Sequence, residues 1–239
     1  MIRISSLALA ACCWVLPAAA IVIRTDRDDA EYLELASRYT SSVPLGAAGG
    51  EGVLISARWV LTAAHRAQAI KGIPDYRLRV GTAEHEVESV VLHPRWKPGD
   101  TAHDIALVQL RTDVRGIEFT PVQRVQDEAG ATVVFAAHGN PDGKKRAAIN
   151  TVDHVGAYAL GLDLKPLDAA SDLQGGLMPN ETGAPLFLQA PDGLSVAGIA
   201  AFTDGKRDTY TRVSAYAGWV DSVLLDAAKR AAEKLLGAE

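Results

Sequence analysis

The sequence predicts an all-β protein that ends in one α-helix, and three observations support this fold class. Beyond about residue 50, short apolar runs follow one another closely, and Gly, Pro, Asp or Asn ends each run. Several runs alternate apolar and polar residues with a period of two, as half-buried strands do. The last segment instead repeats with helical spacing. Roughly ten short strands separated by turns are typical of a barrel or a sandwich.

The predicted strands follow each other in two series. The first comprises GVLIS, WVLTAAH, YRLRVG, HEVESVVLH and DIALVQL, and the second comprises ATVVFAAHG, INTVDHVGA, APLFLQA, LSVAGIAAF and YTRVSA. In HEVESVVLH, Val87 and Ser89 are expected on one face and Glu88 and Val90 on the other. The polar stretch 111–123, which contains a Gly and a Pro, is the predicted internal boundary.

A C-terminal helix is predicted from Tyr216 to Leu236. Its apolar residues recur at helical spacing, and they are Val220, Val223, Leu224, Ala227, Ala231 and Leu235. Ser214 or Asp221 is expected to help start the helix, and Gly237 is expected to end it.

Composition and charge exclude several classes of protein. The chain has 239 residues, of which 48% are hydrophobic and 22% charged, enough for one large or two small domains with a real core. The net charge of −5 is spread without blocks, which argues against binding to nucleic acid or to an anionic membrane surface.

The first twenty residues have the layout of a secretory signal. Arg3 precedes an apolar stretch that ends in three alanines, and cleavage is expected after Ala20, with export of the rest of the chain to the periplasm or the exterior. The stretch is too short for a membrane span, and Pro17 with the charged run RTDRDDAE disfavours a buried helix. A lipoprotein cleavage box at Leu9–Cys12 is the second interpretation.

Both cysteines, Cys12 and Cys13, lie inside this signal, so the mature protein is expected to contain none. This excludes a cysteine nucleophile and a Cys-ligated zinc. The histidines at 85, 93, 103, 138 and 154 lack ligand-like spacing and are interpreted as structural or surface residues. No metal site and no cofactor are predicted.

Three stretches carry residue types that catalyse hydrolysis. His65 follows an apolar strand, Asp104 opens an alternating strand, and Thr182 lies in a loop that runs through Gly and Pro into another apolar run. Each is ordinary alone, but their order of His, Asp and hydroxyl is that of a catalytic triad. Ser171 and Ser195 are weaker candidate hydroxyls, because neither precedes a Gly-x-Pro turn.

The motifs WVLTAAH, DIALVQL, TGAPLF, VAGIAAF and YTRVSAYAGWV, in this order, resemble the trypsin/chymotrypsin-like serine proteases. The resemblance extends from Ile21 to the C-terminal helix. It implies two six-stranded antiparallel β-barrels with the site in the cleft between them. The implied parts are a signal at 1–20, an N-terminal barrel at about 21–115, a C-terminal barrel at about 116–215 and a helix at about 216–236.

The same resemblance implies roles for individual residues. His65 would be the general base, Asp104 would orient its imidazole, and the Thr182 hydroxyl would attack the scissile carbonyl of a peptide or protein substrate. The backbone N–H groups of Asn180 and Thr182 would bind the oxyanion.

The nucleophile loop departs from the family pattern. Gly-Asp-Ser-Gly-Gly-Pro is expected, and Asn180 to Pro185 reads NETGAP. The extra methyl of Thr182 restricts its rotamer and crowds the attack. Asn180 replaces a glycine that contributes an oxyanion donor. Glu181 replaces the aspartate that pairs with the freed N-terminus, here expected at Ile21, and it is one methylene longer.

The implied specificity pocket is also unusual. Gly176 stands where trypsin-type members have an acid, and Phe202 and Thr203 would line the wall and the entrance. Asp208 aligns with the opposite wall, where it would attract a basic side chain; a solvated loop carboxylate within DGKRD is the favoured interpretation.

Two functional classes therefore compete, since four of six positions in the loop are altered while His65 and Asp104 are kept. The first is a peptidase impaired by Thr182. The second is a pseudoprotease that binds ligands in the cleft without cleaving them. A β-sandwich adhesin with coincidental motifs is a remote third class.

Overall fold

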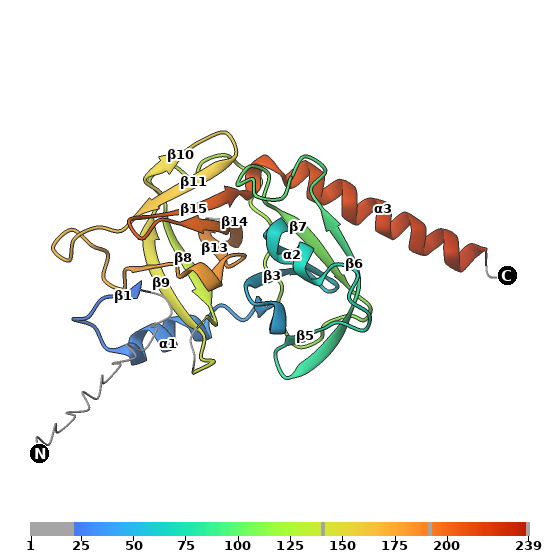
Figure 1. Ribbon diagram of the computed structural model, residues 1–239, viewed down its shortest axis with the longest axis horizontal. Helices are drawn as coiled ribbons and strands as arrows, with labels where there is room; N and C mark the ends of the chain where they lie inside the picture. The colour runs from blue at the N-terminus through green and yellow to red at the C-terminus, as the bar shows by residue number, and fades with distance from the viewer. Residues whose placement is uncertain (1–21, 140–141, 191–192, 238–239) are drawn as a thin grey trace, which may run out of the picture.

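The computed structural model describes residues 22–139, 142–190 and 193–237 (Figure 1). The predicted signal and Ile21 lie outside the described residues. Two antiparallel sheets, each mostly formed by consecutive strands, make up the body. A short helix, α1 (Asp29–Ser37), precedes them, with the Asp28 side chain capping its first turn.

The N-terminal sheet has six strands in the order β2-β3-β4-β7-β6-β5. They are β2 (Ser42–Pro44), β3 (Glu51–Ser56), β4 (Trp59–Thr62), β5 (Arg77–Val80), β6 (Ala83–Leu92) and β7 (Ala106–Leu110), with a 3-10 turn η1 (Gly46–Ala48) after β2 and helix α2 (Ala64–Ile70) after β4. The edge strands β2 and β5 contact each other, so the sheet curls into a nearly closed barrel.

The C-terminal sheet has seven strands in the order β10-β11-β15-β14-β13-β8-β9. They are β8 (Thr132–Ala137), β9 (Arg146–Thr151), β10 (His154–Val155), β11 (Ala159–Asp163), β13 (Pro185–Ala190), β14 (Gly193–Thr203) and β15 (Arg207–Arg212). A separate two-stranded sheet joins β1 (Val22–Ile23) to β12 (Gly175–Gly176), and the 3-10 turns η2 (Pro179–Glu181) and η3 (Val213–Ala215) complete this half.

The predicted fold class is confirmed: the protein consists of two curled antiparallel sheets and a C-terminal helix. The second sheet has one strand more than the six expected, because the two-residue β10 pairs with β11. The regular alternation expected in HEVESVVLH is wrong. The register shifts at a bulge between Val87 and Ser89, which breaks the period of two.

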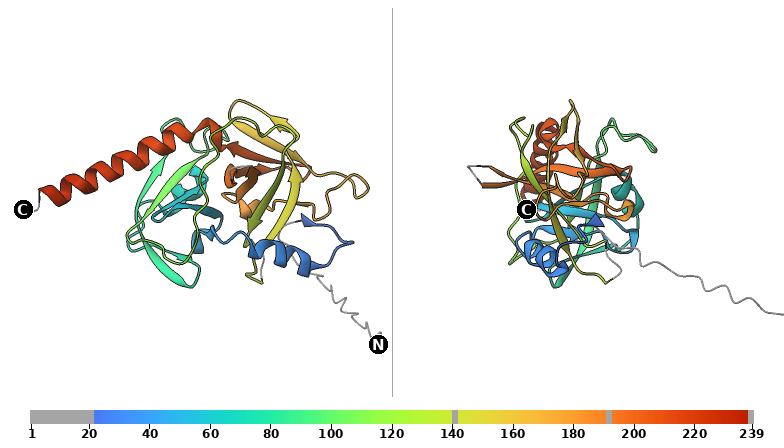
Figure 2. Two further views of the ribbon diagram at one scale, coloured as in Figure 1. Left: turned by 180° about the vertical axis from the view of Figure 1, so that it is seen from behind. Right: turned by 90° about the vertical axis from the view of Figure 1, so that its left-hand side faces the viewer.

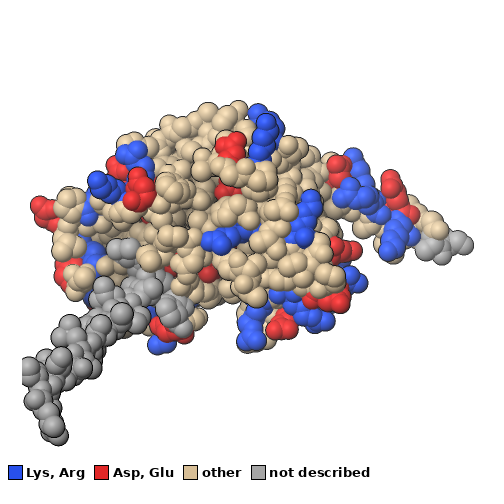
Figure 3. Space-filling view, viewed as in Figure 1, with Lys and Arg blue, Asp and Glu red and all other residues tan. Residues whose placement is uncertain are grey.

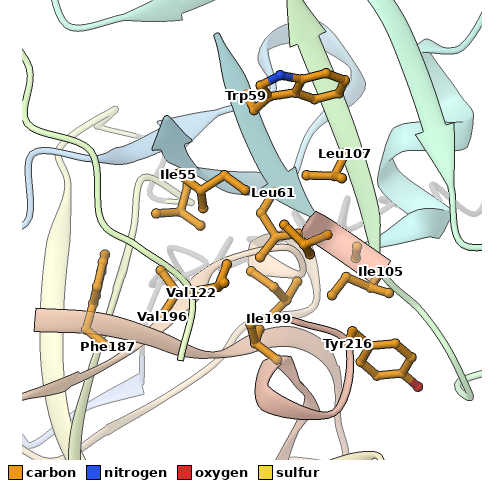
Figure 4. Close-up of a cluster of buried hydrophobic side chains, with 14 of the residues drawn as sticks. Ile55, Trp59, Leu61, Ile105, Leu107, Val122, Phe187, Val196, Ile199 and Tyr216 are labelled. Atoms are coloured by element: carbon orange, nitrogen blue, oxygen red, sulfur yellow. The ribbon is translucent and has the colours of Figure 1, made fainter. Parts of the chain in front are cut away.

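The largest part of the core lies between the two sheets (Figure 4). Leu61 and Leu107 enter it from the N-terminal sheet, and Val196 and Ile199 enter it from the C-terminal sheet. Full burial of such side chains contributes about 1.5–3 kcal/mol each. Because both sheets share this core, the loops at their junction are held at a fixed separation.

Helix α3 (Ala217–Leu236) leaves the C-terminal sheet and passes the N-terminal one (Figure 2). Val220 is buried in the shared core, whereas Leu235 and Leu236 are 76% and 78% exposed at the projecting end. Charged residues of both signs lie on this projecting end and are scattered over the viewed face (Figure 3). In the described part of the chain, no helix combines the length and the apolar run needed to cross a bilayer.

The predicted bounds of this helix agree with the structure to within one residue, but the residues predicted to help start it are wrong. The helix begins at Ala217, and the Ser214 hydroxyl donates to the buried carboxylate of Glu128 instead of capping it. Asp221 lies inside the first turns. Gly237 is the C-terminal capping residue, as predicted.

Candidate active site

Strand pairing brings His65 and Asp104 together. Strands β4 and β7 are antiparallel neighbours in which Thr62 pairs with Ala106. His65 follows Thr62 by one short turn at the start of α2, and Asp104 precedes Ala106 by two residues. Both side chains therefore emerge at the same edge of the N-terminal sheet.

Asp104 holds His65 through two hydrogen bonds, one to its backbone and one to its imidazole. Its Oδ1 accepts from the His65 backbone N–H at 2.9 Å, and its Oδ2 lies 2.6 Å from His65 Nδ1. The carboxylate is only an acceptor, so Nδ1 carries the proton and Nε2 is left as the acceptor. Asp104 is buried, and the Thr211 hydroxyl from β15 donates to its carbonyl oxygen at 2.9 Å.

The third predicted residue completes the set. Thr182 Oγ1 lies 2.8 Å from His65 Nε2, across a sequence separation of 117 residues. The hydroxyl can donate to Nε2, and proton transfer along this bond would convert it into a nucleophile. The structure thus brings together all three residues predicted as a triad.

The N-terminal sheet also holds the backbone around Thr182. The N–H of Glu51 in β3 donates to the Thr182 carbonyl at 3.0 Å. At Gly183, φ is +91°, and a Cβ there would lie 2.0 Å from the Glu51 carbonyl oxygen. Only glycine fits, because a side chain would face both the steric clash and the strained backbone. Glu51 itself is buried, and its carboxylate accepts from the His138 backbone at 2.7 Å.

Arg66 is a site residue that sequence reasoning missed. Its Nε donates to Thr182 Oγ1 at 2.6 Å, and its Nη2 donates to the Pro179 carbonyl at 2.8 Å. Gly50 makes room for it, since a Cβ there would lie 2.7 Å from Arg66 Cδ. Burial lowers the pKa of the guanidinium, while the charge of Asp104 raises it. The only sequence signal is its place directly after His65.

The turn before Thr182 is a 3-10 turn in which the Glu181 N–H donates to the Met178 carbonyl at 2.9 Å. The Pro179 carbonyl faces Arg66 and so lies on the same side as the Thr182 hydroxyl. In a trans peptide the C=O and the next N–H point in opposite directions. The Asn180 N–H therefore points away from the guanidinium, and the Asn180 side chain donates to the Gly139 carbonyl at 2.7 Å.

Asn180 stands where the family has glycine, but its backbone does not need a glycine's conformational freedom. Among the described non-glycine residues, only Asp75 and His103 have positive φ. Asn180 thus adopts the turn without left-handed strain.

Glu181 is fully buried behind the loop. Its Oε2 accepts from the Met178 N–H at 2.8 Å, and its Cγ would lie 2.3 Å from a Cβ at Gly139. The predicted partner, Ile21, lies outside the described residues. The next two residues form β1, which pairs with Gly175–Gly176. The pairing of Ile21 with Glu181 stays a prediction.

The interpretation of Asp208 as a solvated carboxylate is wrong, because its exposed fraction is 0%. Strand β15 is covered on both edges, by β11 and by β14. Oδ2 accepts from the Leu177 N–H at 2.9 Å, whereas Oδ1 has no hydrogen-bond partner among the described residues. The hydroxyl of Tyr210, two residues along the same strand face, likewise has none there. Burial raises the pKa of Asp208.

The other residues predicted for the pocket lie nearby in the sheet pairing. Thr203 pairs with Asp208 and Phe202 with Thr209 across β14 and β15, and Phe202 is 49% exposed. Gly176 lies in β12, next in sequence to the Leu177 amide that bonds Asp208. A Cβ at Gly176 would lie 2.8 Å from the Leu164 side chain.

The weaker hydroxyl candidates are occupied in structural bonds. Ser195 donates to Gln123 at 2.8 Å, and Ser171 donates to the Ile149 carbonyl at 2.8 Å. His93 and His103 stack on each other, with Tyr216 against both rings. Within the described residues, no group of three or more His, Cys, Asp or Glu is placed to hold a metal ion.

Comparisons with known proteins find similarity to serine proteases. The family model described as trypsin matches residues 36–220. Serine protease 56 of Homo sapiens is 29% identical over 214 residues, covering 75% of this chain and 35% of the relative. A calcium-dependent serine proteinase of Mesocricetus auratus is 37% identical over 82 residues, covering 27% of this chain and 11% of the relative. The chain thus spans about a third or less of these relatives. It belongs to the trypsin family of serine proteases.

Proposed function

We propose that this protein hydrolyses peptide bonds with Thr182 as its nucleophile, at a rate limited by that residue. The observation that carries the proposal is the continuous chain of contacts from Asp104 through both nitrogens of His65 to Thr182 Oγ1. A merely structural histidine needs no hydroxyl on its free nitrogen at 2.8 Å, on a loop from the other sheet.

In the proposed reaction, His65 Nε2 takes the proton of the Thr182 hydroxyl as Oγ1 attacks the scissile carbonyl carbon. Asp104 stabilises the imidazolium that forms. The amine leaves with the proton returned by His65, and an acyl ester on Oγ1 remains. Water then attacks the ester, with His65 again as the base, and releases the free acid and Thr182.

Three features make the proposed reaction slow. The Thr182 methyl crowds the attacking oxygen, and a displacement of about 1 Å can cost about 10²-fold in rate. Arg66 occupies one lone pair of the hydroxyl. The Asn180 N–H points away from the guanidinium that lies on the nucleophile, so its peptide must rotate before it can bind an oxyanion. Loss of one such donor costs about 10²–10³-fold.

The proposed acyl-side preference is for a basic side chain. Asp208 Oδ1 and the Tyr210 hydroxyl are buried without partners among the described residues, and a buried polar atom of this kind is costly. A guanidinium or ammonium group from a peptide would satisfy both.

The second candidate function is a pseudoprotease that binds peptides without cleaving them. The hydrogen bond between Arg66 and the Pro179 carbonyl favours this function. It holds the turn in an arrangement in which the Asn180 N–H points away from the site and cannot bind an oxyanion. Peptide binding in the cleft would remain possible.

Export is part of the proposal. Signal removal after Ala20 would free Ile21, and the new ammonium group would pair with the buried Glu181 carboxylate. The mature protein would then act outside the cell or in the periplasm, with no separate activation segment.

Labelling by a fluorophosphonate probe, which reacts with activated hydroxyls, tests the proposed function. Three proteins beginning at Ile21 are compared: wild type, Thr182→Ser and His65→Ala. We expect slow labelling of wild type, labelling about 10²-fold faster with serine, and none without His65. Silence of both wild type and Thr182→Ser, in folded protein, would reject hydrolysis in favour of the pseudoprotease.

A further inference from the structure

The guanidinium of Arg66 is a cation without a counter-ion at the nucleophile. Among the described residues, no carboxylate forms an ion pair with it, and its two hydrogen bonds go to a neutral hydroxyl and a neutral carbonyl. Asp104, the nearest acid that acts on its charge, is already bonded to His65. The chain thus keeps a half-buried guanidinium without an ion-pair partner in its site, and the carboxylate of a ligand can supply that partner.

The guanidinium also keeps donors available. Nε and Nη2 are engaged, and Nη1 makes no hydrogen bond to any described residue. A guanidinium presents its N–H groups in a planar fork that matches the two oxygens of a carboxylate. A carboxylate that engages this fork would also compete for the donor now held by the Pro179 carbonyl.

The position of Arg66 indicates which part of a peptide reaches it. Arg66 belongs to α2 and its side chain packs against Gly50, so it approaches Thr182 from the side of the N-terminal sheet. Asp208 belongs to the C-terminal sheet. If the acyl side chain points toward Asp208, as in the proposed function, the leaving residue lies on the Arg66 side. Nε is 2.6 Å from Oγ1, and the scissile carbon must come within about 3–3.5 Å of that oxygen.

We propose that Arg66 is a carboxylate receptor that selects peptides with a carboxylate on the residue directly after the scissile bond. The carboxylate is either an acidic side chain or the free C-terminus of a peptide that ends there. The proposal rests on the proposed function for the location of the scissile bond, but it concerns binding and holds whether or not cleavage follows.

Binding of matched peptides tests the proposal without turnover. Two C-terminally amidated peptides contain Arg-Glu or Arg-Gln, with the bond between these residues reduced so that it cannot be hydrolysed. Isothermal titration against the protein beginning at Ile21 gives Kd for each. We expect wild type to bind the Glu peptide about tenfold more tightly. A second pair, ending at Gln as a free acid or as an amide, separates the two sources of the carboxylate.

The variants identify the receptor. Arg66→Gln should make the affinities for the Glu and Gln peptides about equal, and Arg66→Lys should retain part of the preference for the Glu peptide. Arg230→Gln, which removes the same charge from the exposed side of α3, should leave the preference unchanged. Equal binding of both peptides by wild type, binding of neither, or a preference that survives in folded Arg66→Gln would overturn the proposal. Absent fluorophosphonate labelling with an intact Glu preference would reject hydrolysis alone.

Discussion

The two sheets contribute unequal halves of the site. His65 and Asp104 come from the N-terminal sheet, where β4 and β7 pair directly and Asp104 bonds both the backbone N–H and the imidazole of His65. Thr182 comes from a loop of the C-terminal sheet, where a 3-10 turn, the β-branched Thr182 side chain and the Arg66 guanidinium meet. The proposed base is therefore positioned by regular strand pairing, whereas the proposed nucleophile depends on a loop held by long-range contacts.

This difference indicates where sequence change is tolerated. The positions of His65 and Asp104 follow from the register of buried strands, which a slip of one residue would destroy. The loop can change its turn and its side chains while its ends stay anchored by Glu51 and by the pairing of β13. An altered loop can therefore coexist with an unaltered arrangement of His65 and Asp104.

The largest expected effect tests whether the N-terminal half is a working base. In a Thr182→Ser background, Asp104→Asn should slow fluorophosphonate labelling about 10⁴-fold, because an amide cannot hold His65 in the tautomer that accepts at Nε2. Asp113→Asn, which alters an exposed ion pair with Arg58, is the control. A loss of less than tenfold would mean that the bond from Asp104 to His65 is structural only.

The next largest effect tests the contact between the loop at Gly183 and strand β3 of the N-terminal sheet. Gly183→Ala should lower the free energy of unfolding by about 3 kcal/mol, since the added Cβ meets the Glu51 carbonyl and φ is positive. Gly130→Ala isolates the clash, because Gly130 has φ of +71° and nothing within 4 Å of its Cβ position. We expect about 1 kcal/mol there, measured by urea unfolding. Equal losses of unfolding free energy in the two variants would show that the loop can move away from the Glu51 carbonyl and so relieve the clash.

The period-two strand pattern predicted the fold class, and motifs that resemble the trypsin-like family predicted that His65, Asp104 and Thr182 lie together. Arg66 could not be found in this way, because it belongs to none of those motifs and its bonds to the Thr182 loop depend on how the two sheets pack. Asp208 was misjudged for a related reason. Its neighbours in DGKRD are polar, but its burial is set by β11 and β14.

A third test concerns the ring cluster of His93, His103 and Tyr216, in which His103 directly precedes Asp104 in the sequence. Burial lowers the pKa of His93 to about 4, and the charges of His103 and Arg95 add to this. The unfolded chain takes up the proton near pH 6.5, so stability is full above that pH and falls as pH drops toward 4.

Urea unfolding measures this effect. Between pH 7 and pH 5, His93 should contribute a loss of about 2 kcal/mol in the free energy of unfolding. His93→Phe, which keeps a ring against Tyr216 and Trp219 but cannot titrate, should lose correspondingly less over the same interval. An identical pH dependence in both proteins would show that His93 is protonated as readily in the folded state as in the unfolded one.

The smallest expected effect returns to the C-terminal half and asks whether its buried acid selects substrates. In the Thr182→Ser background, we compare kcat/KM for a peptide with Arg on the acyl side with kcat/KM for the matching Leu peptide. Asp208→Asn should reduce this Arg/Leu ratio by about tenfold. The variant should fold, because the amide has nearly the same shape as the carboxylate and its oxygen can still accept from the Leu177 N–H. Asp226→Asn, on the exposed side of α3, controls for charge. An unchanged ratio would mean that the Asp208 carboxylate has only a structural role, as an acceptor for the Leu177 amide. Specificity would then have to come from the leaving-group side, where Arg66 lies.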